Sequence, residues 1–249
     1  MQINTYLCRN NPLMKRLLLT LTISLLAASG FAQERKGYIG LGLGPSFANG
    51  DFAENFNNSG SGYAKTGVAI DMSAGYQFSR FAGVMALFKS QLNGYDTKSA
   101  FPGVEAETNG WLSRAFMAGP YASVPLGGNR KAFLEGRALM GFCKTRSPEV
   151  TRIEISSMGA SKAILQSEKA NSLGLVAGLG LRVPFSDRIE LGLHADYFWT
   201  KPEFDYPTIP NAPIQQTITL LNTSVSFSYR FMNVLESRTK PGLLENGTF

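Results

Sequence analysis

Residues 173–199 have the sequence LGLVAGLGLRVPFSDRIELGLHADYFW, in which two alternating segments flank a short polar turn. Every second residue of segment 173–185 is apolar, and the residues between them include Gly, Val and Arg. Segment 189–199 alternates in the same way, with Glu190, His194 and Asp196 on its polar side. Successive strand residues point to opposite faces of a sheet. The stretch therefore predicts two antiparallel strands, each with one apolar face and one small or polar face.

The same period of two recurs elsewhere in the chain. In segment 217–231, Val225, Phe227 and Tyr229 alternate with serines, and in segment 66–78 Ile70, Met72 and Ala74 alternate with polar residues. Eight strands are predicted, at 37–47, 66–78, 81–92, 111–126, 130–144, 173–185, 189–199 and 217–231. The alternation is blurred in the third and fourth, so their faces are left unassigned. Most are as long as the roughly 9–11 residues that a tilted membrane strand needs.

The connections between these strands alternate strictly in length. Residues 48–65, 93–110, 146–171 and 200–216 form long polar connections, whereas residues 79–80, 127–129 and 186–188 form tight turns. Outer-membrane barrels have short turns on the periplasmic side and long loops outside the cell. A soluble antiparallel barrel has no reason to sort its loops by side. The fold class expected is therefore all-β: an eight-stranded antiparallel up-and-down transmembrane β-barrel, preceded by a signal peptide.

In such a barrel the apolar faces meet lipid and the polar faces fill the interior. Charges of both signs occupy these polar faces, as buried charges require partners. The predicted interior polar network consists of Asp71, Glu135, Arg137, Arg182, Glu190, His194, Asp196 and Arg230. The glycines expected to relieve crowding there are Gly40, Gly42, Gly44, Gly174, Gly178 and Gly180. The aromatic residues expected at the bilayer interfaces are Phe78, Phe81, Trp111, Tyr197, Trp199 and Phe231.

The N-terminal region has the features of an export signal. Met14-Lys15-Arg16 precedes the apolar segment 17–28, and Gly30-Phe31-Ala32 supplies small residues at a cleavage site. We expect a signal peptide at 1–32 with its true start at Met14, a barrel domain at 33–231 and a short periplasmic tail at 232–249. The alternative is a buried N-terminal helix.

The net charge and the cysteine content limit the kinds of partner and cross-link that the protein can have. Removing residues 1–32 removes three basic residues and no acidic ones, which lowers the net charge from +6 to +3. This charge is too small to indicate a nucleic-acid partner. Of the two cysteines, Cys8 precedes the apolar segment and leaves with the leader, so Cys143 remains without an intramolecular disulfide partner.

Four segments carry a family resemblance. They are the leader ending in Phe-Ala-Gln, Gly-Tyr-Ile-Gly-Leu-Gly-Leu-Gly-Pro at 37–45, Ala-Gly-Pro-Tyr-Ala-Ser-Val-Pro-Leu at 118–126, and Ser-Phe-Ser-Tyr-Arg-Phe at 226–231. Together they resemble the outer-membrane β-barrel proteins of Bacteroidota, which are loosely similar to the barrel domain of outer-membrane protein A and to PorT-like barrels. The resemblance covers nearly all of residues 33–231. It implies an outer-membrane location and insertion by the barrel-assembly machinery, which would recognise the closing alternation that ends at Phe231.

No residue pattern supports catalysis, a cofactor or a metal. His194 is the only histidine, and its place on a polar face predicts a hydrogen-bond partner in the lumen. The alternative is a Ser/His pair of the kind found in lipid-hydrolysing barrels, with Asp196 orienting the ring. Gly40, Gly42 and Gly44 alternate within a strand, so they do not form a phosphate-binding loop. Charged residues in two places are expected to take part in ion pairs that fill the interior and not to act as catalytic acids or bases. They are Glu135, which neighbours Arg137 on one face, and the carboxylates Asp187 and Glu190, which flank a tight turn.

The function expected is a structural or interaction role, with ligand contacts through the four long loops around a closed interior. The alternatives are a narrow channel for small solutes, a lipid-modifying barrel enzyme, a PorT-like secretion component and a soluble lipocalin-like carrier. The expected partners are outer-membrane lipid and lipopolysaccharide, the barrel-assembly machinery, and an unidentified extracellular ligand. The cations of the third long loop, which face either lipopolysaccharide head groups or solvent, are Arg146, Arg152, Lys162 and Lys169.

Overall fold

The computed structural model describes residues 36–55, 60–79, 81–104, 106–127, 132–156, 159–186, 188–206 and 213–232. The predicted signal peptide at 1–32, with Met14 and Cys8, lies outside these residues. So do Asp187 and the predicted tail beyond Met232. The side chains of Arg152 and Lys162 are also outside the described part.

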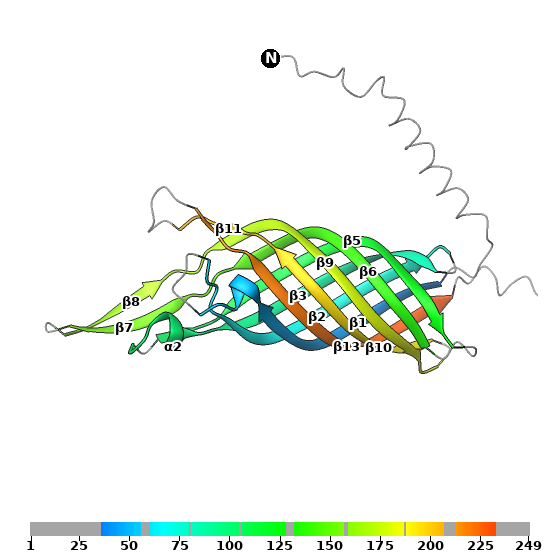
Figure 1. Cartoon of the computed structure of the whole chain (residues 1–249), viewed down its shortest axis with the longest axis horizontal. Helices are drawn as coiled ribbons and strands as arrows, with labels where there is room; N and C mark the ends of the chain where they lie inside the picture. Colours follow the sequence, from blue (N-terminus) through cyan, green and yellow to red (C-terminus); the bar gives the residue numbers. More distant parts are fainter. Residues whose placement is uncertain are drawn as a thin grey trace, which may run out of the picture.

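The described residues form one closed barrel of eight antiparallel strands (Figure 1), so the predicted fold class is correct. The strands are β1 (Lys36–Asn49), β2 (Ala64–Gln77), β3 (Ala82–Tyr95), β5 (Trp111–Leu126), β6 (Ala132–Arg146), β9 (Lys169–Pro184), β10 (Ile189–Thr200) and β13 (Ile218–Met232). Each strand pairs with its neighbours in sequence, and β1 pairs with β13 to close the ring. Closure leaves no unpaired edge for lipid to meet.

The strands extend further at the loop end than the sequence predicts. β9 begins at Lys169 instead of residue 173, and β6 ends at Arg146 instead of residue 144. Their backbone pairing continues to Arg146 opposite Lys169. The alternating pattern marks only the strand residues that face lipid. The backbone hydrogen bonding of the strands continues beyond the lipid zone, where the outward side chains are polar.

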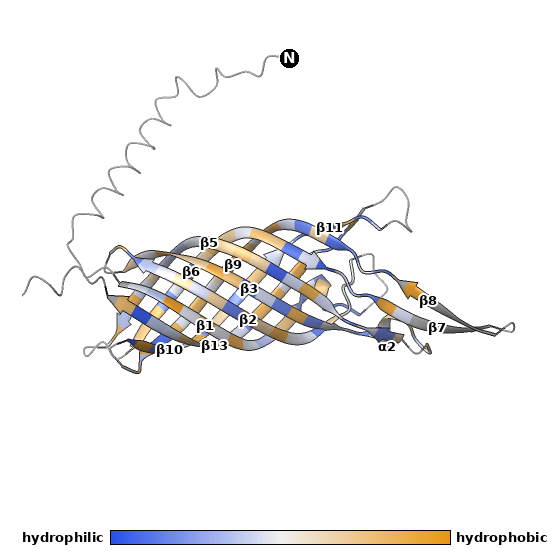
Figure 2. Cartoon of the chain, turned by 180° about the vertical axis from the view of Figure 1, so that it is seen from behind, coloured by the Kyte–Doolittle hydropathy of each residue, from blue (hydrophilic) through white to orange (hydrophobic). Residues whose placement is uncertain are grey.

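The faces agree with the prediction in the strands where the alternation is clear. Leu175, Leu179 and Leu181 of β9 and Val225 and Phe227 of β13 are exposed on the outside of the barrel. Figure 2 shows the resulting alternation of hydrophobic and hydrophilic residues along the strands. A soluble carrier would place its apolar face inward, so that alternative is wrong. At strand ends, Phe78, Phe81, Tyr197 and Phe231 lie outside, as expected for interface aromatics.

The blurred strand β3 now has a physical explanation. Its inward face contains Met85 and Leu87 as well as Lys89 and Gln91, all of them buried. Its outward face carries apolar residues as well, among them Val84. Both faces are therefore partly apolar, and a period of two in hydrophobicity is lost.

The long connections contain short elements of their own. The first holds the 3-10 turn η1 (Gly50–Phe52), and the second holds the single-turn helix α2 (Thr97–Ala100) and β4 (Ala106–Thr108). The third holds β7 (Val150–Ser156) and β8 (Gly159–Leu165), and the fourth holds β11 (Glu203–Phe204) and β12 (Ile214–Gln215). The labelled elements of these connections lie at one end of the barrel (Figure 1). The short turns form the other end.

Residues 150–155 alternate in sequence like the barrel strands, but they are not part of the barrel wall. They belong to β7, which pairs with β8 and β4 in a separate three-stranded sheet. The segment between Arg146 and Val150 ends the barrel strand, and its Ser147 accepts a hydrogen bond from the amide of Glu168 at 2.8 Å. The amide of Ser147 donates to the carbonyl of Glu168 at 2.8 Å, so the contact between the two chain segments continues one residue beyond β6 before the chain enters the small sheet.

An aromatic cap occupies the loop end of the lumen. We use this name for the buried side chains of Phe52, Trp111, Phe204, Ile218 and Leu220. The Trp111 ring packs edge-on against Phe52, with centroids 5.3 Å apart, and its indole N–H donates to the carbonyl of Gly62 at 2.9 Å. The prediction that Trp111 lies at the bilayer interface is therefore wrong. It starts a strand, but it faces inward.

A closed barrel resists unfolding by detergent until it is heated, because no strand edge is available from which pairing can fray. We expect the protein from an outer-membrane fraction to change its apparent size on a denaturing gel once boiled. The measurement compares unheated and boiled samples of the same fraction. An identical mobility in both would contradict a closed barrel, and a form unfolded beforehand in urea serves as the control.

Candidate functional site

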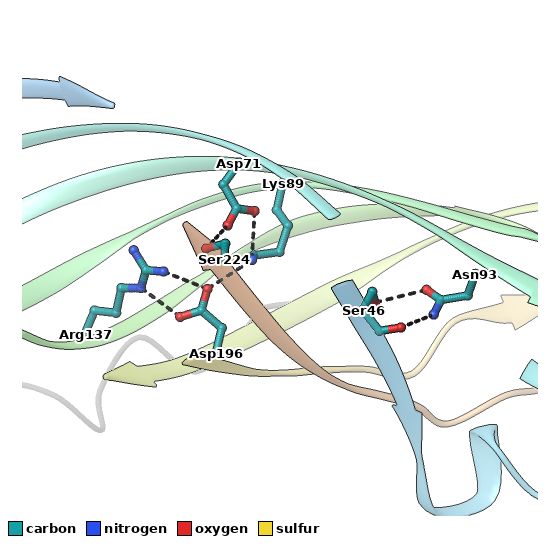
Figure 3. A network of polar contacts seen from close by, with 7 residues as sticks. All are labelled: Ser46, Asp71, Lys89, Asn93, Arg137, Asp196 and Ser224. Atoms are coloured by element: carbon teal, nitrogen blue, oxygen red, sulfur yellow. Dashed lines mark hydrogen bonds and ion pairs between the residues drawn. The ribbon is translucent and has the colours of Figure 1, made fainter. Parts of the chain in front are cut away.

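Four charged side chains meet near the middle of the lumen (Figure 3). The guanidinium of Arg137 on β6 donates two hydrogen bonds to the carboxylate of Asp196 on β10, at 2.8 and 2.7 Å. The Nζ of Lys89 on β3 lies 3.0 Å from Asp196 and 2.8 Å from Asp71 on β2. We call Asp71, Lys89, Arg137 and Asp196 the central ion cluster. All four are buried, and their charges cancel.

The barrel order places Lys89 and Asp196 on diametrically opposite strands. Three strands separate β3 from β10 in either direction around the ring. Their ion pair therefore spans the full width of the lumen. An eight-stranded barrel has an interior just wide enough for side chains, so one extended lysine can reach across it.

Strand register explains why Arg137 and Asp196 can meet. Gly178 of β9 pairs with Arg137 on one side and with Asp196 on the other. A Cβ at Gly178 would collide with the Asp196 carboxylate and would lie 3.1 Å from Nε of Arg137. The glycine leaves open the space in which the two side chains join over the middle strand. The predicted role of Gly178 is thus confirmed.

A second group of charges lies toward the short-turn end. The Nε of Arg182 lies 3.0 Å from Glu135, and its Nη1 lies 3.2 Å from Glu190. Glu190 also pairs with Arg230. The Arg182 guanidinium stands 4.9 Å from the ring centre of Tyr38, which belongs to β1. This group is likewise balanced in charge, with two carboxylates and two guanidinium groups.

All eight predicted interior residues face the lumen, but their partners differ from those the sequence suggested. Glu135 pairs with Arg182 on the adjacent strand, not with Arg137 on its own strand. Lys89 was missed because it lies on the blurred strand β3. The sequence feature that indicates its role is that Lys89 is the single charged residue of the strand segment 82–95.

His194 is a hydrogen-bond partner within the lumen, as predicted. Its Nε2 lies 2.8 Å from the hydroxyl oxygen of Ser226. Its Nδ1 has no hydrogen-bond partner among the described residues and lies against Gly180. Asp196, the residue considered for orienting the ring, is bound instead by Arg137 and Lys89. The described residues thus form a Ser/His contact without the acidic partner that completes a triad.

Apolar and polar layers fill the lumen between the central ion cluster and the aromatic cap. Met117, Leu139, Val176 and Phe198 are buried side chains that point inward from four strands. Closer to the cap, the amide of Asn93 donates to the carbonyl of Ser46 at 3.0 Å. Among the described residues, no group of three or more His, Cys, Asp or Glu side chains is arranged to hold a metal ion. No helix of the described part is long and apolar enough to cross a membrane.

Replacing Asp196 with Asn should destabilise the barrel strongly. The substitution leaves Lys89 and Arg137 without their shared counter-charge, and such losses cost about 3–5 kcal/mol in buried networks. The free energy of unfolding would be measured by urea titration in lipid vesicles. A loss below about 1 kcal/mol would show that the cluster does not hold the barrel together.

Asp96→Asn is the matched control. Asp96 pairs with Lys65 at 3.0 Å, but that lysine side chain is 55% exposed. The hydrogen bond from Lys65 lowers the pKa of Asp96 below its ordinary value. Solvent screens such pairs, so the same substitution should cost less than about 1 kcal/mol here.

The chain matches one family model and is similar to several solved structures. Residues 18–231 match the model of the outer membrane protein beta-barrel domain family. No curated protein matches the chain in sequence. Among solved structures, the chain is similar to Ail, the attachment invasion locus protein of Yersinia pestis, at 16% identity and a TM-score of 0.44, over 80% of this chain and 100% of that one.

Two further structures share this level of similarity. OprG of Pseudomonas aeruginosa matches at 12% identity and a TM-score of 0.42, over 82% of this chain and 99% of that one. Neisserial surface protein A matches at 12% identity and a TM-score of 0.41, over 78% and 97%. The family match covers the described barrel from its first strand to Phe231. The chain therefore belongs to the outer membrane protein beta-barrel domain family, and it is a protein of the outer membrane.

Proposed function

We propose that this barrel is a closed scaffold that presents a loop surface outside the cell, with a structural or interaction role in place of transport or catalysis. The observation that carries the proposal is the ion pair between Lys89 and Asp196, which crosses the lumen between opposite strands. The Arg137 side chain fills the same level. A solute would have to separate buried opposite charges to pass, and that separation is costly.

The contacts between the long loops support the proposed role of the loops in binding a partner. Contacts between different loops hold them together: the side chain of Gln216 donates to the carbonyl of Gly60 at 3.0 Å, and the amide of Asp96 donates to the carbonyl of Tyr63 at 2.8 Å. Burial raises the pKa of Tyr206, whose ring packs against the aromatic cap. Loops fixed in this way lose little conformational entropy when they bind a partner.

Two finer expectations remain predictions. The resemblance to Bacteroidota and PorT-like barrels supports a role in secretion only by analogy of family, and no residue contact favours it. Recognition by the barrel-assembly machinery has one supporting feature: β13 keeps its outward apolar pattern from Leu221 to Phe231 and pairs with β1 as the closing strand.

A closed lumen should not conduct ions. We expect purified protein in a planar lipid bilayer to give no reproducible unit steps in current, because the cross-lumen pair and the aromatic cap leave no continuous aqueous path. A porin from the same type of membrane is the positive control. Unit steps of constant size, scaling with salt concentration, would favour the narrow channel instead.

If the protein were a lipid-hydrolysing enzyme, His194 would have to act as its catalytic base. A serine nucleophile needs a histidine base that is oriented by an acid, and the Nδ1 of His194 lacks such a partner among the described residues. We therefore expect no release of fatty acid from phospholipid or lipid A by the wild-type protein. Hydrolysis that is lost in a His194→Ala variant, while Ser228→Ala retains it, would establish the enzyme.

A further inference from the structure

A patch of basic residues lies on the outer wall of the barrel, away from the interior charges. Arg114 on β5 and Lys144 on β6 are exposed and alternate with buried neighbours, so they face outward. Arg146 on β6 and Lys169 on β9 occupy the next outward positions toward the loop end. We call these four residues the outer cation patch. Within the part of the chain that the structure describes, none of them forms an ion pair.

Strand register sets like charges opposite each other in this patch. Arg114 pairs directly with Lys144, and Arg146 pairs directly with Lys169. Cross-strand partners have Cβ atoms about 4.5–5.5 Å apart, and like charges in that arrangement are destabilising. Two such pairs follow one another along the same face. An anion bound between them would remove the repulsion.

An aromatic and aliphatic row lies directly below the patch. Phe88, Phe116, Phe142 and Leu173 are register neighbours across four adjacent strands, and all are exposed outward. A groove of about 630 Å³ joins the two zones. Its polar end is lined by Arg114, Lys144 and Asn171, and its apolar end by Phe116, Phe142 and Leu173. The groove thus has the two-part chemistry of a lipid.

The height of the patch matches the edge of the hydrocarbon. On β5 the outward face carries no charge from Phe116 to Leu126. At about 3.3 Å per residue and a strand tilt of about 40°, this segment spans about 25 Å along the barrel axis, the height of the apolar band of such barrels. Arg114 is the next outward residue on the loop side. It therefore lies at the level of lipid head groups.

The cations are concentrated on one side of the barrel. At the loop end of β1, β2, β10 and β13, the outward positions are occupied by uncharged residues such as Phe47, Val68 and Leu221. Two exposed lysines lie near the loop end of these strands: Lys65, near the start of β2, is neutralised by Asp96, and Lys201 directly follows β10 as a single cation. A general attraction to an anionic surface would not require this asymmetry. A bound ligand at one place on the wall would.

We propose that the outer cation patch and the groove beneath it form a binding site for a phosphorylated lipid of the outer leaflet, of the lipopolysaccharide class. Its phosphates lie between the paired cations, and its acyl chains lie on the row formed by Phe116, Phe142 and Leu173. Guanidinium and ammonium groups bind phosphate through charge-assisted hydrogen bonds, which are stronger than those between neutral groups. The site depends on the outer-membrane location, and it is independent of the proposed role of the loops.

The test measures lipid binding to the intact refolded barrel in phosphatidylcholine nanodiscs. Bisphosphorylated lipid A is titrated as the probe, and bound lipid is counted by native mass spectrometry. The test variant is Arg114→Gln/Lys144→Gln. Each lost charge-assisted contact weakens binding about tenfold, so the expected affinity for the double variant is lower by at least that factor. Lipid A stripped of its phosphates should bind the wild type with similarly reduced affinity.

The control variant is Lys98→Gln/Arg188→Gln, which changes the net charge equally at one exposed lysine and one exposed arginine outside the patch. It should bind lipid A as the wild type does, and both variants should keep the heat-dependent gel shift. Equal losses in the two variants, or equal binding of the phosphate-free lipid, would overturn the proposal. So would full displacement of lipid A by an equal concentration of inorganic phosphate, which would identify a site for free phosphate.

Discussion

Charge neutralisation inside a narrow lumen is the constraint on which the structure depends. The wall of the barrel must be apolar because hydrocarbon cannot solvate polar groups, so charged side chains of the spanning segments have to point inward. There they lose most of their water, and each needs a partner of opposite sign. Asp196 satisfies this requirement with Arg137 and Lys89 together. The side chains that close the lumen are thus the same ones that tie its opposite walls together.

On the outside of the barrel, the described charged residues lie only beyond the hydrocarbon of the membrane. These charges are excluded from the apolar band, and they appear where head groups begin, as at Arg114 and Lys144. Interior charges are balanced within the protein, whereas the outer cation patch is unbalanced among the described residues. That difference separates charges that stabilise the fold from charges available to a ligand.

The alternating strands made the fold predictable from sequence. In β2, β9, β10 and β13 the lipid side is mainly apolar and the lumen side is mainly polar or small, so one pattern predicts both the strand and its orientation. The positions of residues that cover the ends of the closed barrel could not be predicted from the alternation alone. Trp111 starts a strand as interface aromatics do, yet it turns inward because Phe52 and Phe204 cover the loop end.

The partners within the lumen could not be predicted for the same reason. Period-two analysis identifies the face of a residue but not its distance from residues on other strands. The contact between Lys89 and Asp196 joins positions 107 residues apart, and only the order of strands around the ring brings them together. β7 likewise continued the strand pattern in sequence, although it belongs to a separate sheet with β4 and β8.

The central ion cluster also constrains the order of assembly. Its members come from β2, β3, β6 and β10, so the cluster is incomplete until most of the chain has paired. A half-formed sheet in lipid would expose Lys89 and Asp71 on a face with no opposite wall. Such an intermediate is costly in hydrocarbon. Insertion one hairpin at a time is therefore disfavoured, and the strands should curl together before they are released into the bilayer.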